Sequence, residues 1–313
     1  MQTTSHVLMV RPARFTANPE TMATNAFQRP VGPEVEVQGA ALAEFDGYAA
    51  ALASAGVSVL VVQDSPEPHT PDSVFPNNWV SFHEDGTQVL YPMEAPNRRR
   101  ERKPAVLAAV AERFAVRRTL DLTAFESEGR FLEGTGSMVL DRVHRLAYLG
   151  RASRSHPEVV EAFCGALGYR AVWFDATDSA GTPIYHTNVM MAVGRTLAVV
   201  CLEALEDSTQ RIRLQGFLRE TGKVVLPITR AQMTAFAGNM IELRGWNGHP
   251  VLAMSRRAWA SLSQAQRDLI LTHAQPVVAP IDTIETCGGG GTRCMVAEIH
   301  LPPRAEEGRL EAV

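Results

Sequence analysis

Cysteine is scarce in this sequence, and long hydrophobic runs are missing. The 313 residues include only four cysteines, at positions 164, 201, 287 and 294, and their spacing shows no disulfide framework. Cys287 and Cys294 lack the nearby Cys and His companions of a zinc site, so we expect no metal. No apolar run approaches the ~18 residues of a membrane span. The first residues lack the basic and apolar segments of a signal peptide, so we expect a cytoplasmic protein.

An excess of positive charge is also missing. The net charge of −4 gives no electrostatic footprint for nucleic acid. The one basic cluster, residues 98–103, is interrupted by Glu101 and is typical of a solvated helix start. No nucleotide or flavin motif appears, so we expect no cofactor. We therefore expect a small-molecule ligand, and neither nucleic acid nor a membrane as a partner. A homodimer is left open.

The sequence does contain an internal repeat, in which a helix, a strand and a loop lead to one polar residue, followed by a strand, a tight turn and a strand. The polar residues are Asn78, Glu133, His186, Asn239 and Cys294, at steps of 55, 53, 53 and 55 residues. Such a fixed period is typical of repeat architectures. Five units around an axis would bring the five side chains to one mouth. This predicts a single α/β domain over residues 1–313, with a flexible tail from about residue 303.

The hydrophobic pattern places the elements of these units. Helices are predicted at residues 38–56, 99–115, 157–167 and 209–220, and a last helix at about 257–273. Strands are predicted at 7–10 and 57–62, and at both sides of each tight turn. A final strand is predicted at residues 295–301, where apolar and other side chains alternate.

A glycine-rich stretch precedes this last strand. Residues 287–295 read CGGGGTRCM, and four glycines in a row can turn sharply and approach a ligand closely. Cys294 would then lie where a loop meets a rigid element, which suits a nucleophile. The alternative is a glycine-rich connector beside a buried cysteine, because free Cys is usually a small core residue.

A thiol, an imidazole and a carboxylate in one mouth suit nucleophilic catalysis on a carbon that bears nitrogen leaving groups. Cys294 would attack as the thiolate, and His186 would transfer protons to the leaving nitrogen and from water. Glu133 would hold a substrate N–H or orient the histidine. The alternatives are a structural histidine and a Glu-Gly turn; the regular placement of both residues in the repeat favours catalysis.

Four motifs, in order, resemble those of the guanidino-group-modifying enzymes. They are DSVFPNN at residues 72–78, FLEG at 131–134, HTN at 186–188 and GGTRCM at 290–295. This superfamily, the pentein fold, includes arginine deiminase, dimethylarginine dimethylaminohydrolase and the amidinotransferases. The resemblance covers roughly residues 7–301. The opening segments MVRP, NPET and NAFQ are similar to the arginine-deiminase-related branch, which includes citrulline-utilisation hydrolases (citrulline ureidases).

The resemblance implies a five-bladed α/β propeller with pseudo-fivefold symmetry and the site at its centre. It implies that Cys294 is the nucleophile, His186 the general acid/base and Glu133 the substrate-binding carboxylate.

The resemblance also implies residues that bind the rest of the substrate. Asp72 belongs to the first motif and is a substrate-binding candidate. Residues 93–101 and 149–155 resemble the segments that carry two arginines for a substrate carboxylate, which indicates Arg98 and Arg154. The planar fork of arginine binds a carboxylate bidentately. For both arginines the alternative is a solvated charge at a helix start.

Asn78 and Asn188 depart from the deiminase pattern, which has aspartates at these positions. A guanidinium group has only donors, whereas a ureido group is neutral and has a carbonyl oxygen that needs donors. Asparagine supplies an NH₂ group for that oxygen, and losing two carboxylates leaves a buried guanidinium undercompensated. The alternative is that both asparagines cap turns. We therefore predict a citrulline ureidase, which converts L-citrulline to L-ornithine, ammonia and carbon dioxide.

Other functions remain open from the sequence. An arginine deiminase or a dimethylarginine hydrolase-like enzyme would use the same residues on a guanidinium group. An amidinotransferase would use the same nucleophile but must admit an amine acceptor and exclude water. A non-enzymatic binding module is a further alternative, because the fold also serves as a ribosome-binding factor.

Overall fold

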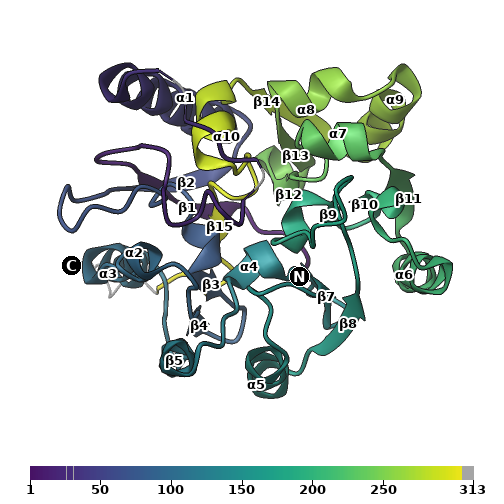
Figure 1. Cartoon of the computed structure of the whole chain (residues 1–313), viewed down its shortest axis with the longest axis horizontal. Helices are drawn as coiled ribbons and strands as arrows, with labels where there is room; N and C mark the ends of the chain where they lie inside the picture. The colour runs from purple at the N-terminus through teal and green to yellow at the C-terminus, as the bar shows by residue number, and fades with distance from the viewer. Residues whose placement is uncertain (26, 31, 305–313) are drawn as a thin grey trace, which may run out of the picture.

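The repeat predicted from the sequence corresponds to five small sheets. The computed structural model describes residues 1–25, 27–30 and 32–304. Within these residues, five three-stranded sheets are arranged around a common centre (Figure 1). In each sheet the middle strand pairs antiparallel with the first strand of its unit and parallel with the last. The predicted mixed α/β fold with five similar units is therefore confirmed.

The strands fall into three groups by their place in the unit. The first strands are β3 (Val80–Phe82), β6 (Val139–Asp141), β9 (Met191–Val193), β12 (Ile241–Arg244) and β15 (Ala297–Glu298). The middle strands are β4 (Thr87–Leu90), β7 (Leu146–Gly150), β10 (Leu197–Val200), β13 (Pro250–Ser255) and β1 (His6–Arg11). The last strands are β5 (Arg118–Asp121), β8 (Arg170–Phe174), β11 (Val224–Pro227), β14 (Gln275–Ala279) and β2 (Ser58–Gln63).

Helices connect the middle strand of each unit to its parallel partner, as a parallel crossover requires. They are α1 (Glu34–Ser54), α2 (Pro96–Arg99), α3 (Pro104–Arg113), α5 (Pro157–Leu167), α6 (Ser208–Glu220), α8 (Arg256–Ser261) and α9 (Gln264–His273). Shorter helices lie before the first strands, namely α4 (Gly134–Ser137), α7 (Arg230–Thr234) and α10 (Asp282–Gly288).

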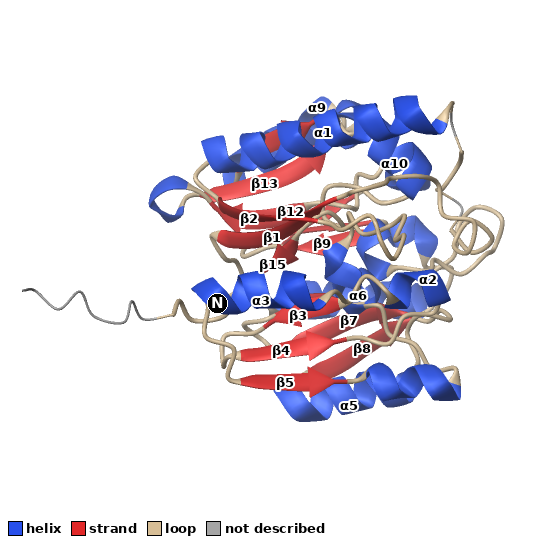
Figure 2. Ribbon diagram, turned by 90° about the vertical axis from the view of Figure 1, so that its left-hand side faces the viewer, coloured by secondary structure: helices blue, strands red, loops and turns tan. Residues whose placement is uncertain are grey.

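The crossover helices pack on the outside of the sheets, as α1 and α5 show at opposite edges of the molecule (Figure 2). Helix α1 buries Val37, Ala41, Phe45, Tyr48 and Leu52, which are spaced three or four residues apart and so share one face. These side chains belong to one hydrophobic cluster with residues of β1, β14 and α10. No helix among the described residues is both long and apolar enough to cross a bilayer.

The two ends of the chain meet in the fifth sheet. Strand β15, near the C-terminus, pairs with β1, so the repeat is completed by segments that are far apart in sequence. The predicted tail begins in contact with this part of the protein: Pro303 bridges to Phe114, and the N–H of Arg304 donates to the carbonyl oxygen of Arg113. The remainder of the predicted tail, residues 305–313, lies outside the described residues.

Three predicted elements differ from the structure. The helix predicted at residues 99–115 is divided into α2 and α3, because Pro104 lacks an N–H and begins a new helix. The helix at 257–273 is divided into α8 and α9, where Ser263 forms a capping box with Gln266. It is not the last helix, since α10 follows. The strand predicted at 295–301 is limited to Ala297–Glu298.

Candidate active site

The five polar residues of the repeat occupy equivalent positions, each in the short turn before the first strand of its sheet. Asn78 ends a 3₁₀ turn, Glu133 precedes α4, and His186 precedes a second 3₁₀ turn. Asn239 and Cys294 lie in the turns before β12 and β15. All five are at most 4% exposed. The repeat thus brings side chains from five distant segments into the interior.

Cys294 follows the glycine stretch, but its local structure differs from the prediction. The first glycines belong to the end of α10, and Gly289 has a φ of 67°, the left-handed conformation that ends a helix. Residues 291–294 form a tight turn in which the N–H of Cys294 donates to the carbonyl oxygen of Gly291. The thiol is therefore held in an ordered turn between α10 and β15.

The sulfur of Cys294 is surrounded by amide groups. Asn188 Nδ2 lies 3.4 Å and Asn239 Nδ2 lies 3.3 Å from Sγ. Burial raises the pKa of the thiol, and the hydrogen bonds from Asn239 and Asn188 oppose that rise. Cys294 is thus a protonated thiol at neutral pH that already faces donors suited to its anion.

His186 and Glu133 form a buried pair. His186 Nε2 lies 2.8 Å from Glu133 Oε2. Burial lowers the pKa of His186 to about 4, although Glu133 works against it. Burial opposes ionisation of Glu133, but Arg154, His186 and Arg98 outweigh it and hold the pKa of that carboxyl well below its usual range. A carboxylate only accepts, so Nε2 carries the proton and Nδ1 is left as a base.

Arg98 is enclosed by protein groups on one side of this pair. Its Nε and Nη2 bind the carboxylate of Glu101 at 2.8 and 3.0 Å, a bidentate ion pair. Its Nη1 donates to Asn78 Oδ1 at 3.0 Å. Nε also lies 3.6 Å from Asp72 Oδ2. Arg98 is therefore a buried residue of the cluster, which excludes the alternative of a solvated helix-start charge.

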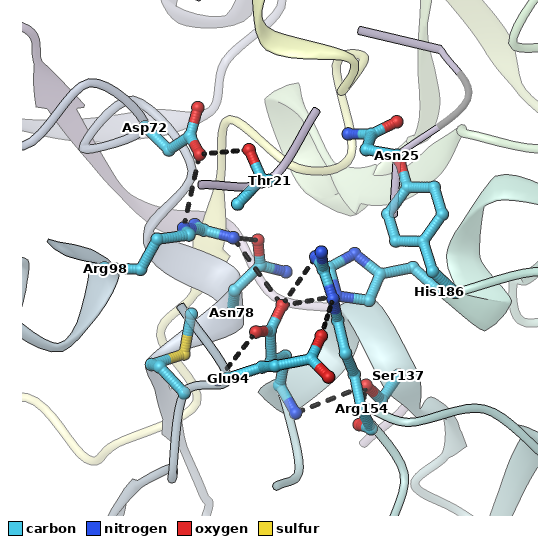
Figure 3. A network of polar contacts seen from close by, with 12 residues as sticks. Thr21, Asn25, Asp72, Asn78, Glu94, Arg98, Ser137, Arg154 and His186 are labelled. Atoms are coloured by element: carbon cyan, nitrogen blue, oxygen red, sulfur yellow. Dashed lines mark hydrogen bonds and ion pairs between the residues drawn. The ribbon is translucent and has the colours of Figure 1, made fainter. Parts of the chain in front are cut away.

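Arg154 lies on the other side of the network, next to His186 (Figure 3). Its guanidinium binds Glu94 at 3.0 Å and Glu133 at 3.2 Å, and it donates to Thr24 Oγ1 at 2.6 Å. The group also stacks 5.1 Å from the centre of the Tyr185 ring. With 2% of its side chain exposed, Arg154 too is a buried member of the cluster and not a solvated charge.

Asp72 and Asn78 each carry one buried polar atom without a hydrogen-bond partner among the described residues. These atoms are Asp72 Oδ1 and Asn78 Nδ2. Asp72 Oδ2 is bound by the amide of Asn18 at 2.7 Å, and burial raises the pKa of this carboxyl. Buried polar groups are normally paired, so an unused acceptor and an unused donor in one site indicate groups available to a ligand.

These residues line a narrow cavity with a volume of ≈ 20 Å³, room for about one water. Its walls include Asp72, Asn78, Arg98, Arg154, His186 and Cys294. Thr21 and Asn25, from the segment between β1 and α1, also form part of the wall. The segment between β1 and α1 therefore helps to enclose the cavity.

The structure thus brings together every candidate proposed from the sequence, and it adds residues that sequence reasoning missed. Asn239 contacts the thiol, although only its place in the repeat indicated a role. Glu101 and Glu94 hold the two arginines. Thr24 stands between two motifs, NPET and NAFQ, that were used for the resemblance alone. The NH₂ group of Asn188, a predicted substrate contact, lies beside the sulfur.

Comparisons with known proteins agree with this geometry. The family model for N,N dimethylarginine dimethylhydrolase, eukaryotic, matches residues 11–301. A search of curated protein sequences found no match. The N-terminal domain of ArgZ, an arginine dihydrolase from the ornithine–ammonia cycle in cyanobacteria, superposes with a TM-score of 0.71 and 17% identity, over 95% of this chain and 98% of that domain.

Two further solved structures share the fold. Full-length ArgZ superposes with a TM-score of 0.71 and 16% identity over 96% of this chain, which spans only 41% of ArgZ. DDAH from Pseudomonas aeruginosa superposes with a TM-score of 0.65 and 14% identity over 96% of this chain and all of that chain. At these identities the likeness concerns the fold, and the five sheets of this protein have counterparts in a set of hydrolases.

Proposed function

We propose that this chain, which belongs to the family of eukaryotic-type N,N dimethylarginine dimethylhydrolases within the pentein superfamily, hydrolyses the ureido group of L-citrulline. It is a hydrolase that acts on carbon–nitrogen bonds other than peptide bonds, and the proposal concerns its substrate and residues. The five sheets would form the blades of a propeller that is one catalytic domain.

The amide of Asn78 carries the substrate assignment. Arg98 donates to Asn78 Oδ1, so the orientation of the amide is fixed. Its NH₂ group lies next to Gly136, is buried, and has no hydrogen-bond partner among the described residues. A ureido carbonyl oxygen is an acceptor that can use this donor, whereas a guanidinium group has only donors. A guanidinium placed there would leave two sets of N–H groups facing each other, a costly arrangement.

The chemistry begins with transfer of the Cys294 proton to His186 Nδ1. The thiolate then attacks the ureido carbon, and the electron pair of the carbonyl moves to oxygen, beside the Asn78 donor. His186 returns the proton to the terminal nitrogen, which leaves as ammonia. Water, deprotonated by His186, hydrolyses the carbamoyl thioester. The resulting N-carboxylated ornithine releases carbon dioxide and ornithine.

Neighbouring structures support a covalent route of this kind. An ArgZ variant with an asparagine changed to serine is covalently bonded to a reaction intermediate. A Pseudomonas aeruginosa DDAH variant with a cysteine changed to serine is complexed with citrulline. Both proteins share only the fold with this chain. They support the reaction type, and the substrate is inferred from the local geometry of the site.

The charged side of the cavity and the family match favour a second candidate, hydrolysis of the guanidino group of arginine or of a methylated arginine. Two arginines, Arg98 and Arg154, are accompanied by four carboxylates, those of Asp72, Glu94, Glu101 and Glu133. An excess of carboxylates suits a cationic substrate. ArgZ, described as an arginine dihydrolase, is bound to its substrate in one structure. We place citrulline first because the NH₂ group of Asn78 is a donor without a partner among the described residues.

The ratio of kcat/KM for citrulline to that for arginine tests the assignment. We expect the wild type to prefer citrulline, and Asn78→Asp to lower the ratio at least about tenfold, because a carboxylate exchanges the donor for an acceptor that suits a guanidinium. Asn188→Asp and the double variant should be measured alongside, since Asn188 also contacts the sulfur.

Asn247→Asp, on an exposed turn, is the matched control and should leave the ratio unchanged. A wild type that prefers arginine, or an Asn78→Asp variant with an unchanged ratio, would contradict citrulline as the substrate.

A further inference from the structure

Asn239 is the fourth polar residue of the repeat, and no role follows for it from the family resemblance. We propose that it is a catalytic residue that, together with Asn188, donates amide hydrogen bonds to the thiolate of Cys294. This inference rests on the proposed role of Cys294 as the nucleophile. It specifies how a buried sulfur anion is stabilised before substrate chemistry begins.

The geometry around the sulfur is that of a two-donor site. Asn239 Nδ2 lies 3.3 Å and Asn188 Nδ2 lies 3.4 Å from Sγ. The two asparagines are themselves connected, because Asn239 Nδ2 donates to the backbone oxygen of Asn188 at 3.0 Å. Both are about 1% exposed, so water does not compete for the sulfur from their side.

The surrounding backbone fixes which end of the Asn239 amide faces the thiol. Asn239 Oδ1 accepts the backbone N–H of Arg293 at 3.1 Å. Thr292 Oγ1 donates to the backbone oxygen of Asn239 at 3.1 Å, which attaches the turn that carries Cys294 to the fourth repeat. A rotated amide would face the Arg293 N–H with its own NH₂ group, so the oxygen must stay there. The thiol also contacts this oxygen at 3.8 Å, and the nitrogen is the nearer end at 3.3 Å.

The same contact explains why a glycine is needed at position 291. A Cβ atom at position 291 would lie 2.7 Å from Asn239 Oδ1. That distance is shorter than real contacts allow, so a side chain at this position would displace the amide from the Arg293 N–H. The glycine immediately before the Thr-Arg-Cys segment therefore allows the close approach of Asn239.

Neutral donors suit the proposed substrate. Proton transfer from Sγ to His186 creates an anion in a buried site where burial already raises the thiol pKa. A guanidinium substrate would bring a positive charge to the sulfur, but a ureido group is neutral and brings none. The positive charge of Arg293 also lowers the pKa of the thiol, while its guanidinium donates to the Val296 oxygen and to Glu298. The protein must then stabilise the thiolate itself, and the two amides are the donors in place.

Titration of the thiolate in the free enzyme tests this role, followed by its ultraviolet absorbance with Cys294→Ser as the reference. Asn239→Asp keeps the shape but replaces the donor with an acceptor. We expect it to lower the thiolate fraction at a fixed alkaline pH by about ten- to a hundredfold, the scale of a hydrogen bond to a charged group. The same variant should lower kcat for citrulline more than it changes KM.

Asn247→Asp is the control, because Asn247 lies on an exposed turn. It makes the same change from amide to carboxylate and should leave the Cys294 titration unchanged. Asn239→Ala decides the question if Asn239→Asp does not fold, and it too should lower the thiolate fraction.

An unchanged Cys294 titration in a folded Asn239 variant overturns the proposal, and so does an equal shift in Asn247→Asp. Because the titration uses no substrate, its result does not depend on whether the enzyme prefers citrulline or arginine. A wild type that prefers arginine would contradict the proposed substrate while leaving the role of Asn239 to be decided by the titration.

Discussion

Around Cys294 the nearest polar groups are amides, whereas around Arg98 and Arg154 they are carboxylates. On the first side Asn188 and Asn239 contact the sulfur. On the second, each guanidinium is held by at least one buried or half-buried carboxylate. Asn78 is connected to the second side through Arg98, which binds its oxygen, and its nitrogen has no hydrogen-bond partner among the described residues.

This difference shows how one small cavity can bind the charged end of a substrate on one side and react with its uncharged end on the other. An amino acid substrate has a charged end, with an ammonium and a carboxylate, and a ureido end without charge. Charged partners suit the first end, and neutral donors that leave the reacting carbon electrophilic suit the second. If the two sides act separately, changes near the sulfur should affect turnover and changes on the charged side should affect substrate binding. Loss of turnover should be largest for the change at the nucleophile.

Loss of the nucleophile should have the largest effect. Cys294→Ser should fold as the wild type does and lose turnover of citrulline by several orders of magnitude, because a serine hydroxyl is a far weaker nucleophile without a dedicated base network. Steady-state ornithine release measures it. Cys164→Ser, in the outer helix α5, is the control and should retain activity. Normal turnover by Cys294→Ser would place the chemistry elsewhere.

Removal of His186, the group that transfers protons, should have the second-largest effect on turnover. His186→Ala should reduce kcat by about 10²–10⁴-fold, the usual scale of general acid–base catalysis. Both formation and breakdown of the covalent intermediate should slow, since one imidazole serves both steps. Rapid quenching with mass spectrometry of the intact protein follows the intermediate. Wild-type turnover in this variant would show that the pair with Glu133 is structural.

A change on the charged side should be smaller and should affect binding. Asp72→Asn keeps the shape but weakens the acceptor offered by the unpartnered Oδ1. We expect KM for citrulline to rise roughly tenfold with kcat little changed, because an ammonium ion prefers a carboxylate. KM for arginine should rise equally, since both amino acids share the ammonium group. A change in the citrulline-to-arginine ratio would contradict the separation of the two sides.

The sequence predicted the repeat and its five polar positions because both follow from local patterns with a fixed period. The elements around Pro104 and Ser263 were predicted less well, since each lies within an apolar pattern that continues across a helix break. The contacts of Glu101 and Asn239 could not be predicted, because they depend on how turns from different units meet. The direction of an amide such as that of Asn188 depends on the same packing.

The pH dependence should show the smallest effect, and it tests the state in which the site rests. Burial lowers the pKa of His186 to about 4 and raises that of the Cys294 thiol above its ordinary value. At neutral pH the cavity of the free enzyme is therefore lined by a neutral imidazole and a protonated thiol, the form that can begin the reaction. Below pH 4 the imidazole is protonated and cannot accept the thiol proton.

It follows that kcat/KM for citrulline should be nearly flat between about pH 5 and 8 and should change less than about twofold over that range. The acid limb should appear only near pH 4, where circular dichroism must show that the protein is still folded. An acid limb centred near the ordinary histidine pKa of about 6.5 would contradict it. That result would mean that His186 is partly charged at neutral pH. The free enzyme would then not hold the neutral imidazole and the protonated thiol on which the proposed mechanism depends.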